Sequence, residues 1–418
     1  MSLAFDFNLD DRYHFRPTLE IPARPFFDWD SIPEEQLQAL AFQIGMTELV
    51  SYWKIACPKR VLVKPFALTE KQKAFWKKLY YNGLGEFLYL NGISISESEL
   101  LIIESERNQE FDKVALPLLE KTLVPIGGGK DSVVTLECLR NAMPVTPLIV
   151  NPRGATLNCV KTAGYKEDEF IVINRTLDPT MLKLNAEGYL NGHTPFSALL
   201  AFISVLVAFG SRSKYIALSN ENSANESTVP GTKINHQYSK SIEFESDFRN
   251  YVAENLNPEV QYFSFLRPLS ELQIAKLFSQ CEAYHPVFRS CNAGSKTDSW
   301  CGKCPKCLFT WIILSPFLSR EKLVAIFGKD LMADESLRPI LEELNGTAAV
   351  KPFECVGTVE EVNACLKAAG TSTSSVTASS KVPEPVEGPT VDEILSRFNT
   401  NHVLPEKFEQ ILKSRLHV

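Results

Sequence analysis

The chain has 418 residues, of which 44% are hydrophobic and 22% are charged. These fractions are typical of a globular protein, and the length is sufficient for two or three domains. The formal net charge is −7, with 43 Lys and Arg against 50 Asp and Glu. This balance argues against a nucleic-acid-binding protein, because phosphate recognition needs clustered basic side chains.

The N-terminal residues 1–10 are acidic and lack the apolar core of a signal peptide. The longest apolar stretch, residues 196–209, is too short to cross a membrane and is interrupted by two serines. We therefore expect a cytoplasmic protein that does not bind a membrane. The sequence is compatible with a homodimer.

Residues 1–117 are mixed in character and rich in aromatic side chains. Helices are expected over residues 34–42 and 70–79, and no motif of chemistry stands out. We interpret this segment as an N-terminal lid or substrate-recognition domain of mixed α/β structure.

Residues 118–285 alternate between strand-like and helix-like segments. Strands are expected at residues 123–126, 146–150, 169–174, 215–219 and 261–265. Helices are expected at residues 132–140, 195–210, 241–254 and 270–280. Thr194 with Pro195 and Ser270 with Gln273 are typical of helix N-termini. This order predicts the α/β class, with a doubly wound parallel sheet that binds its ligand at the carboxyl ends of the strands.

The most informative segment is the turn at residues 127–132, GGGKDS, between an expected strand and an expected helix. Glycines let the backbone approach an anion closely, and the N–H groups of the following helix point at it. The turn is too short for a Walker loop and lacks the later glycines of a dinucleotide fingerprint. We interpret it as a phosphate-binding loop, and a ligand-free turn is the alternative.

Polar residues outside this loop supply further candidates. Residues 220–227 begin where a strand is expected to end, which is where ligand-binding loops lie in such sheets. Each candidate could also be an ordinary turn or surface residue. The candidates are His193, Glu221, Glu226, Lys233, His236, Tyr238 and Lys240.

Four of the ten cysteines, at positions 291, 301, 304 and 307, have the spacing C-x9-C-x2-C-x2-C. Two-residue gaps let neighbouring thiolates converge on one tetrahedral Zn²⁺, and four sulfurs leave no open position for a catalytic water. We expect Cys291, Cys301, Cys304 and Cys307 to hold a structural zinc in a helical C-terminal part, residues 286–368. Reduced core cysteines and a redox pair are the alternatives.

Residues 369–389 are rich in Ser, Thr, Pro and Glu, and we expect a flexible linker there. Thr390 and Glu393 form a capping box that opens a helical tail over residues 390–418. We expect the apolar face of that tail to dock on the body of the protein, with a partner as the alternative.

The turn at 127–132 resembles the Ser-Gly-Gly-x-Asp-Ser loop of the ATP pyrophosphatase (PP-loop) superfamily, of adenine nucleotide α-hydrolase-like fold, with Gly127 in place of the first serine. The resemblance implies cleavage of ATP between the α and β phosphates. It implies phosphate binding by Gly127, Gly128, Gly129 and Ser132 and charge neutralisation by Lys130. Asp131 is expected either to fix the turn or to orient Mg²⁺. The loop and the four cysteines together also resemble the 7-cyano-7-deazaguanine synthase branch, and a tRNA-modifying enzyme of this type is the alternative.

Three further stretches, at 191–198 (NGHTPFSA), 218–227 (LSNENSANES) and 351–358 (KPFECVGT), resemble the MurL family of UDP-N-acetyl-α-D-muramoyl-L-alanyl-L-glutamate epimerases. The similarity covers roughly residues 10–366. It implies an isomerase of peptidoglycan biosynthesis, and thus of cell-wall formation, cell shape and cell division. The implied reaction is ATP-dependent inversion of the terminal L-glutamate of UDP-MurNAc-L-Ala-L-Glu through an acyl adenylate, with release of AMP and pyrophosphate.

The resemblance leaves the residue that removes the Cα proton open. The ranked candidates for this base are His193, Glu221, Glu226 and His236. Cys355 is a lesser candidate, because cofactor-free glutamate racemases use thiol bases but a lone cysteine is more often part of a core. A nucleotide-binding protein without turnover is the remaining alternative, and the intact Asp131-Ser132 pair argues against it.

Overall fold

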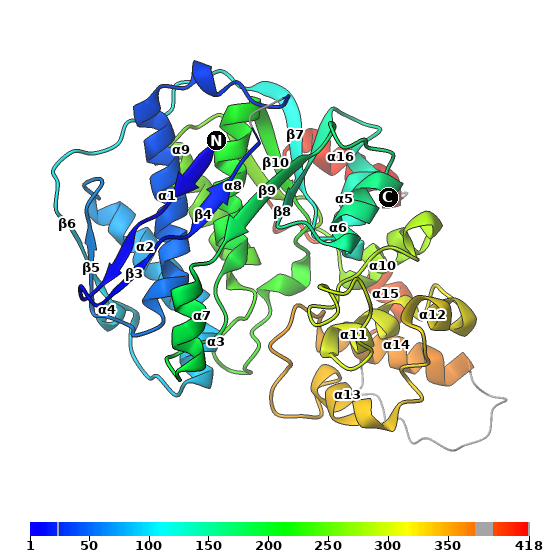
Figure 1. The fold of residues 1–418 in the computed structure, drawn as a ribbon. Coiled ribbons are helices and arrows are strands. Elements are labelled where there is room, and N and C mark those ends of the chain that lie inside the picture. The colour runs from blue at the N-terminus through cyan, green and yellow to red at the C-terminus, as the bar shows by residue number, and fades with distance from the viewer. Residues whose placement is uncertain (23–24, 373–387, 417–418) are drawn as a thin grey trace.

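The computed structural model describes residues 1–22, 25–372 and 388–416. These residues form a mixed α/β protein around a seven-stranded, mostly parallel sheet (Figure 1). The predicted α/β class and parallel sheet are confirmed.

The main sheet has the strand order β1-β4-β9-β8-β7-β10-β11. The five strands from β9 to β11 are parallel, and β1 and β4 add to the β9 edge in antiparallel fashion. The strands are β1 (Ser2–Ala4), β4 (Thr18–Glu20), β7 (Leu119–Pro125), β8 (Val145–Val150), β9 (Ile171–Thr176), β10 (Ser213–Leu218) and β11 (Gln261–Ser264). The chain runs from β7 through β8 to β9 on one side, and β10 and β11 lie on the other. The order therefore reverses between β7 and β10, which is where open α/β sheets bind their ligands.

Helices cover both faces of this sheet. Leu123 of β7 belongs to a core shared with α1, α2, α8 and α9, whereas its neighbour Val124 belongs to a core shared with α5, α10 and α11. Successive strand side chains point to opposite faces, so a strand buried on both faces reads as a continuous apolar run. This double burial explains the apolar character of the predicted strands.

The helices are α1 (Glu34–Trp53), α2 (Glu70–Gly83), α3 (Gly85–Leu90), α4 (Glu97–Leu100), α5 (Lys130–Leu139), α6 (Gly154–Thr162), α7 (Pro179–Ala186), α8 (Phe196–Ser211), α9 (Ile242–Asn255), α10 (Glu271–Ser279), α11 (Pro305–Leu314), α12 (Arg320–Phe327), α13 (Arg338–Leu344), α14 (Val359–Ser372), α15 (Val391–Leu395) and α16 (Glu406–Leu416). Two small sheets pair β2 (Phe7–Leu9) with β3 (Tyr13–Phe15) and β5 (Arg60–Val63) with β6 (Ile102–Ser105). Short 3-10 turns include η2 (Asn222–Asn225) and η3 (Tyr238–Lys240).

The N-terminal residues take part in the main sheet. Figure 1 shows β1 and β4, in blue, beside the green strand β9, and α1 packs on α8. Helix α1 extends eleven residues beyond the predicted end at 42, to Trp53, because most of its second half is buried between these elements.

The expected start of the helix near residue 195 was wrong by one position. Pro195 stands at the N-cap and α8 begins at Phe196, with no side-chain cap from Thr194. The ring of Pro195 packs against Gly83 of α2, where a Cβ would come within 2.8 Å of it. Pro195 thus joins the start of α8 to the end of α2.

The C-terminal tail docks on the body, as predicted. Ile394, Phe408 and Leu412 are buried, and the ring of Phe408 lies 4.5 Å from that of Phe263 on β11. Figure 1 shows α16, in red, beside α5. The predicted linker begins inside α14, and its residues 373–387 lie outside the described residues.

Candidate active site and zinc centre

The glycine-rich loop lies at the carboxyl end of β7, where the strand order reverses. Gly128 has a φ of +80°, and a Cβ there would lie 2.9 Å from the backbone nitrogen of Thr156, so only glycine fits. Gly127 is exposed, with nothing within 4 Å of its Cβ direction. No side chain caps the first N–H groups of α5 at Gly129. These features suit a backbone cradle for an anion.

Lys130 points away from the open side of this loop. Its buried Nζ forms ion pairs with the carboxylates of Asp131 and Glu271. Burial alone would lower the pKa of Lys130, but these two carboxylates raise it. Ser132 Oγ donates a hydrogen bond to the Gly129 carbonyl at 3.0 Å. Asp131 remains partly exposed and is the loop carboxylate with open access.

A second cluster forms around Glu86 of α3. Glu86 Oε2 lies 3.7 Å from Nδ1 of His193 and hydrogen-bonds Nδ1 of His236. The centroids of the two imidazole rings are 4.3 Å apart. Lys54, at the end of α1, donates to the Gly192 carbonyl and to Asn191 Oδ1, which holds the loop of His193 in place.

The two histidines have opposite pKa shifts. Burial lowers the pKa of His193 to about 3, and the charges of His236 and Lys54 add to the effect. Burial also disfavours charge on His236, but hydrogen bonds to Cys355 and Glu86 raise its pKa to about 9. At neutral pH, His193 is therefore neutral and His236 is an imidazolium.

Cys355 completes this cluster. Its Sγ accepts a hydrogen bond from Lys240 Nζ at 3.1 Å and is also a hydrogen-bond partner of His236. Burial would raise the pKa of the thiol, but Lys240, Lys306 and His236 lower it to about 6. Cys355 is therefore a thiolate at neutral pH, and its side chain is only partly buried.

Lys240 connects the two clusters electrostatically. Burial alone would lower its pKa, but Cys355, Glu221 and Asp131 raise it. Glu221 follows β10 and accepts a hydrogen bond from Ser223 Oγ at 3.2 Å. The loops after β7 and β10 thus converge on one lysine, which in turn contacts the thiolate.

Glu226 has a cationic partner of its own. Its carboxylate pairs with Lys351, whose Nζ also donates to the Gly357 carbonyl at 2.9 Å. Lys351 lines a surface pocket of 390 Å³ whose lining includes residues 350–354, directly before Cys355. The last of these lining residues, Glu354, is the sequence neighbour of Cys355.

Sequence reasoning missed Glu86, Lys54 and Lys306 as members of the site. Glu86 and Lys54 lie in a segment without motifs, and only their tertiary position brings them to the histidines. Lys306 offered one signal, since it lies between Cys304 and Cys307 in the four-cysteine motif. The ligand atoms of Glu86, His193 and His236 lie within 4.8 Å of one another. The surrounding lysines disfavour a cation at this place.

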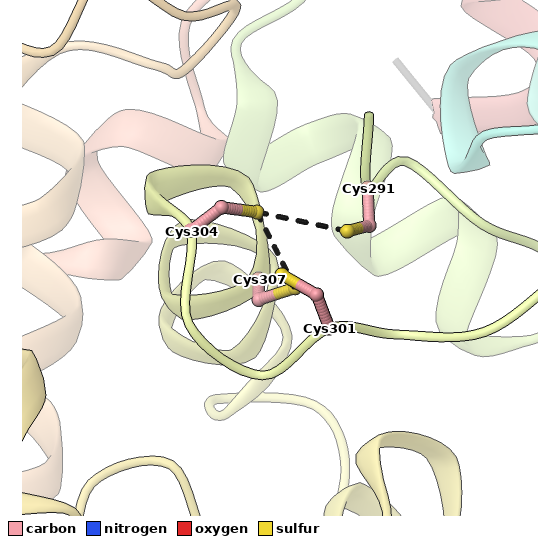
Figure 2. A group of neighbouring side chains, drawn as sticks. All are labelled: Cys291, Cys301, Cys304 and Cys307. Carbon is pink, nitrogen blue, oxygen red and sulfur yellow. Dashed lines mark hydrogen bonds between the residues drawn. The ribbon is translucent and has the colours of Figure 1, made fainter. Parts of the chain in front are cut away.

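The four predicted metal ligands converge, as Figure 2 shows. Cys304 Sγ lies 3.7 Å from Cys291 Sγ and 3.5 Å from Cys307 Sγ, and Cys301 Sγ lies 3.7 Å from Cys307 Sγ. Four sulfurs about 2.3 Å from a central Zn²⁺ in a tetrahedron lie about 3.8 Å from one another. The cluster could therefore hold a zinc ion. The backbone N–H of Gly294 donates to Cys291 Sγ at 3.1 Å, as expected around a thiolate.

Comparison with known proteins identifies the family of this chain. Residues 1–265 match the MurL N-terminal domain, and residues 287–383 match the MurL C-terminal domain. The chain belongs to the MurL family. Membership makes it an epimerase, which is a class of isomerase, and the match decides against the deazaguanine-synthase alternative.

Three MurL relatives carry the name UDP-N-acetyl-α-D-muramoyl-L-alanyl-L-glutamate epimerase. The protein of Micromonospora sp. is 40% identical over 354 residues, covering 82% of this chain and 77% of that protein. That of Salinispora tropica is 36% identical, covering 82% and 75%. That of Xanthomonas oryzae pv. oryzae is 34% identical, covering 81% and 76%.

The matched MurL regions contain the glycine-rich loop, the histidine cluster and the four cysteines. The glycine-rich loop and both histidines fall in the N-terminal match, and the four cysteines and Cys355 fall in the C-terminal match. Within the described part of the chain, none of the helices combines the length and apolar character needed to cross a membrane.

Proposed function

We propose that the protein inverts the terminal L-glutamate of UDP-MurNAc-L-Ala-L-Glu to D-glutamate in peptidoglycan precursor synthesis, with cleavage of ATP to AMP and pyrophosphate. The substrate is taken from the names of the MurL relatives. The observation that carries the ATP step is the glycine-rich loop with an uncapped helix N-terminus at the reversal of strand order. Lys240 links this loop electrostatically to the cluster of Glu86, His236 and Cys355, and we propose that this cluster supplies the groups for proton transfer.

The chemistry explains why an epimerase would consume ATP. A free carboxylate opposes removal of the neighbouring Cα proton, because the product would carry two adjacent negative charges. Conversion of the carboxylate to an acyl adenylate removes one charge and makes the Cα proton more acidic. Hydrolysis of the adenylate after inversion then regenerates the carboxylate.

Residues at the loop fit the expected groups. Gly127, Gly128 and Gly129 would cradle the phosphates through their backbone, with Ser132 beside them. Asp131, which is partly exposed, would hold Mg²⁺, and the cation would offset the charge of pyrophosphate. Lys130 already has two carboxylate partners, so we propose that it fixes Asp131 and stabilises the turn.

We propose a structural zinc at Cys291, Cys301, Cys304 and Cys307. Bound zinc would join the loop at residues 291–301 to the start of α11. That join fixes Lys306, whose charge favours the Cys355 thiolate.

The decisive experiment incubates the purified chain with MgATP and UDP-MurNAc-L-Ala-L-Glu. We expect AMP, pyrophosphate and D-glutamate in the product, measured by mass spectrometry and chiral analysis after acid hydrolysis. Asp131→Asn should abolish AMP formation while leaving the far-UV circular dichroism unchanged. The matched control Asp168→Asn changes a carboxylate outside the site and should retain activity. ADP as the nucleotide product would contradict the PP-loop assignment.

A further inference from the structure

The proposed reaction needs a base at Cα, and most of the candidate groups are occupied. His236 carries a proton because Glu86 and Cys355 stabilise its charged form. Glu226 is paired with Lys351, and Glu221 is buried with Ser223 as its partner. His193 is neutral, but its environment strongly disfavours taking up a proton. The thiolate of Cys355 is the remaining basic group among these neighbours.

We propose that Cys355 Sγ removes the Cα proton from the activated glutamate, and this assignment rests on the proposed function. The Cα–H bond breaks and an S–H bond forms, while the electron pair moves to the acyl carbonyl oxygen as an enolate. A second acid on the opposite face gives the enolate a proton and takes one from solvent. The Cys355 thiol returns its proton to solvent, which restores the thiolate.

The position of Cys355 supports this role. Lys240 Nζ lies 3.1 Å from Sγ, and the carboxylates of Asp131 and Glu221 are close enough to raise the pKa of Lys240. The thiolate therefore lies near the loop where the adenylate would form. It is partly exposed and directly follows the segment that lines the 390 Å³ pocket. In this proposal the glutamyl group approaches Cys355 from the side of the pocket, and the nucleotide portion of ATP lies at the loop.

The charged groups that face Cys355 come from three parts of the chain. Lys240 belongs to η3, Lys306 to α11, and His236 to the loop before η3, with Glu86 and His193 behind His236. We assign His236 and Lys240 as positioning residues that keep the sulfur ionised and in place. Lys306, at the start of α11, also lowers the pKa of Cys355.

The test compares Cys355→Ser with Cys281→Ser, a cysteine at the end of α10 outside the cluster. Three properties are measured: substrate-dependent exchange of labelled pyrophosphate into ATP, inversion, and deuterium uptake at Cα from heavy water for each epimer. For Cys355→Ser we expect inversion to fall by at least about 100-fold, since a general base contributes 10²–10⁴-fold. We expect pyrophosphate exchange to stay within about threefold of the unsubstituted chain. Deuterium uptake should be lost for one epimer only, because the second acid still serves the other.

These readouts separate the thiol step from the proposed function. Normal inversion in Cys355→Ser, or loss of pyrophosphate exchange together with inversion, would overturn the role of Cys355. Inversion by the unsubstituted chain without AMP formation would instead overturn the ATP-dependent function. If Cys355→Ser fails to fold, iodoacetamide treatment of the unsubstituted chain replaces it. Alkylation at Cys355 should then block inversion, spare pyrophosphate exchange and be slowed by substrate.

His236→Gln tests the positioning role. Removal of the imidazolium should move the acidic limb of the inversion pH profile upward from about 6, towards the ordinary thiol pKa of about 8.5. A purely structural contribution would lower the rate without moving this limb. An unchanged pH profile would therefore overturn the assignment of His236.

Discussion

Two histidine rings lie side by side in this site, yet their surroundings shift their pKa values in opposite directions. Glu86 forms its closer contact with His236, and Cys355 adds a second anionic partner to the same ring. The pKa of His193 is lowered mainly by burial and by neighbouring positive charges. Proton affinity at this scale is thus decided by which ring has the anionic partners, since both rings are largely buried.

The thiolate gives a prediction for single residues. Iodoacetamide reacts with the thiolate form, so the alkylation rate at each cysteine rises with pH through that cysteine's pKa. We expect a midpoint near pH 6 for Cys355 and near pH 11 for Cys281, whose pKa is raised by burial. Peptide mass spectrometry after short alkylation pulses measures both rates in one sample. A Cys355 midpoint at or above the usual thiol value would contradict the proposed ion pairs.

At the scale of secondary-structure elements, one buried arginine joins the loops that build the site. Arg267, which follows β11, is fully buried and donates to the backbone carbonyls of Glu221, at 2.6 Å, and Lys240. It also pairs with the buried carboxylate of Glu245 on α9 at 3.0 Å. Arg267 thereby holds the loop after β10 beside the turn η3.

We predict that Arg267→Met destabilises the fold by about 3–5 kcal/mol, because it leaves the Glu245 charge buried without a partner. Urea unfolding followed by fluorescence measures the change. Arg338→Met is the matched control, since the Arg338–Glu342 pair is exposed and such pairs contribute at most about 1 kcal/mol. Equal effects of the two substitutions would show that the buried pair is not essential.

The zinc element gives a second prediction at this scale. Cys304→Ser should reduce bound zinc from about one equivalent to near zero and lower the melting temperature, because metal binding is coupled to folding of such short loops. Elemental analysis and calorimetry measure these changes. Cys281→Ser should retain the metal. Retention of full thermal stability by a zinc-free Cys304→Ser protein would refute a structural zinc.

At the scale of the whole molecule, distant parts of the chain complete one folded body. β1 and β4 extend the sheet at one edge, and the tail covers the opposite part of the sheet through α16. Phe408 packs against Tyr215 and Phe263, and Lys407 Nζ lies 3.8 Å above the Tyr215 ring. The tail therefore belongs to the core that also contains α5 and α11.

We predict that Phe408→Ala costs about 3–5 kcal/mol of folding free energy, as is usual when a buried aromatic side chain is truncated. Ile411→Ala, at a partly exposed position of the same helix, should cost less. Chemical denaturation of both variants tests the difference. Equal stability of Phe408→Ala and the unsubstituted chain would contradict docking of the tail.

The local features of this protein could be predicted from the order of its residues. Each parallel strand contains a short apolar run, the glycine-rich loop is a contiguous GGGKDS, and three of the four clustered cysteines are spaced by two-residue gaps. Each of these patterns depends on neighbouring residues, and the structure places all four cysteines together. Helix α8 begins one residue later than expected, at Phe196, and helix ends are the part of a pattern that neighbouring residues define least sharply.

The cluster around Glu86 and Cys355 forms only in the folded chain. Glu86, His193, His236, Lys240, Lys306 and Cys355 come from separate segments spread over about 270 residues, and no spacing rule links them. The pKa values that distinguish thiolate, imidazolium and neutral imidazole depend on burial and on charges a few ångströms away. Those quantities exist only once η3, α11 and α3 are packed together, because they contribute the charges of Lys240, Lys306 and Glu86.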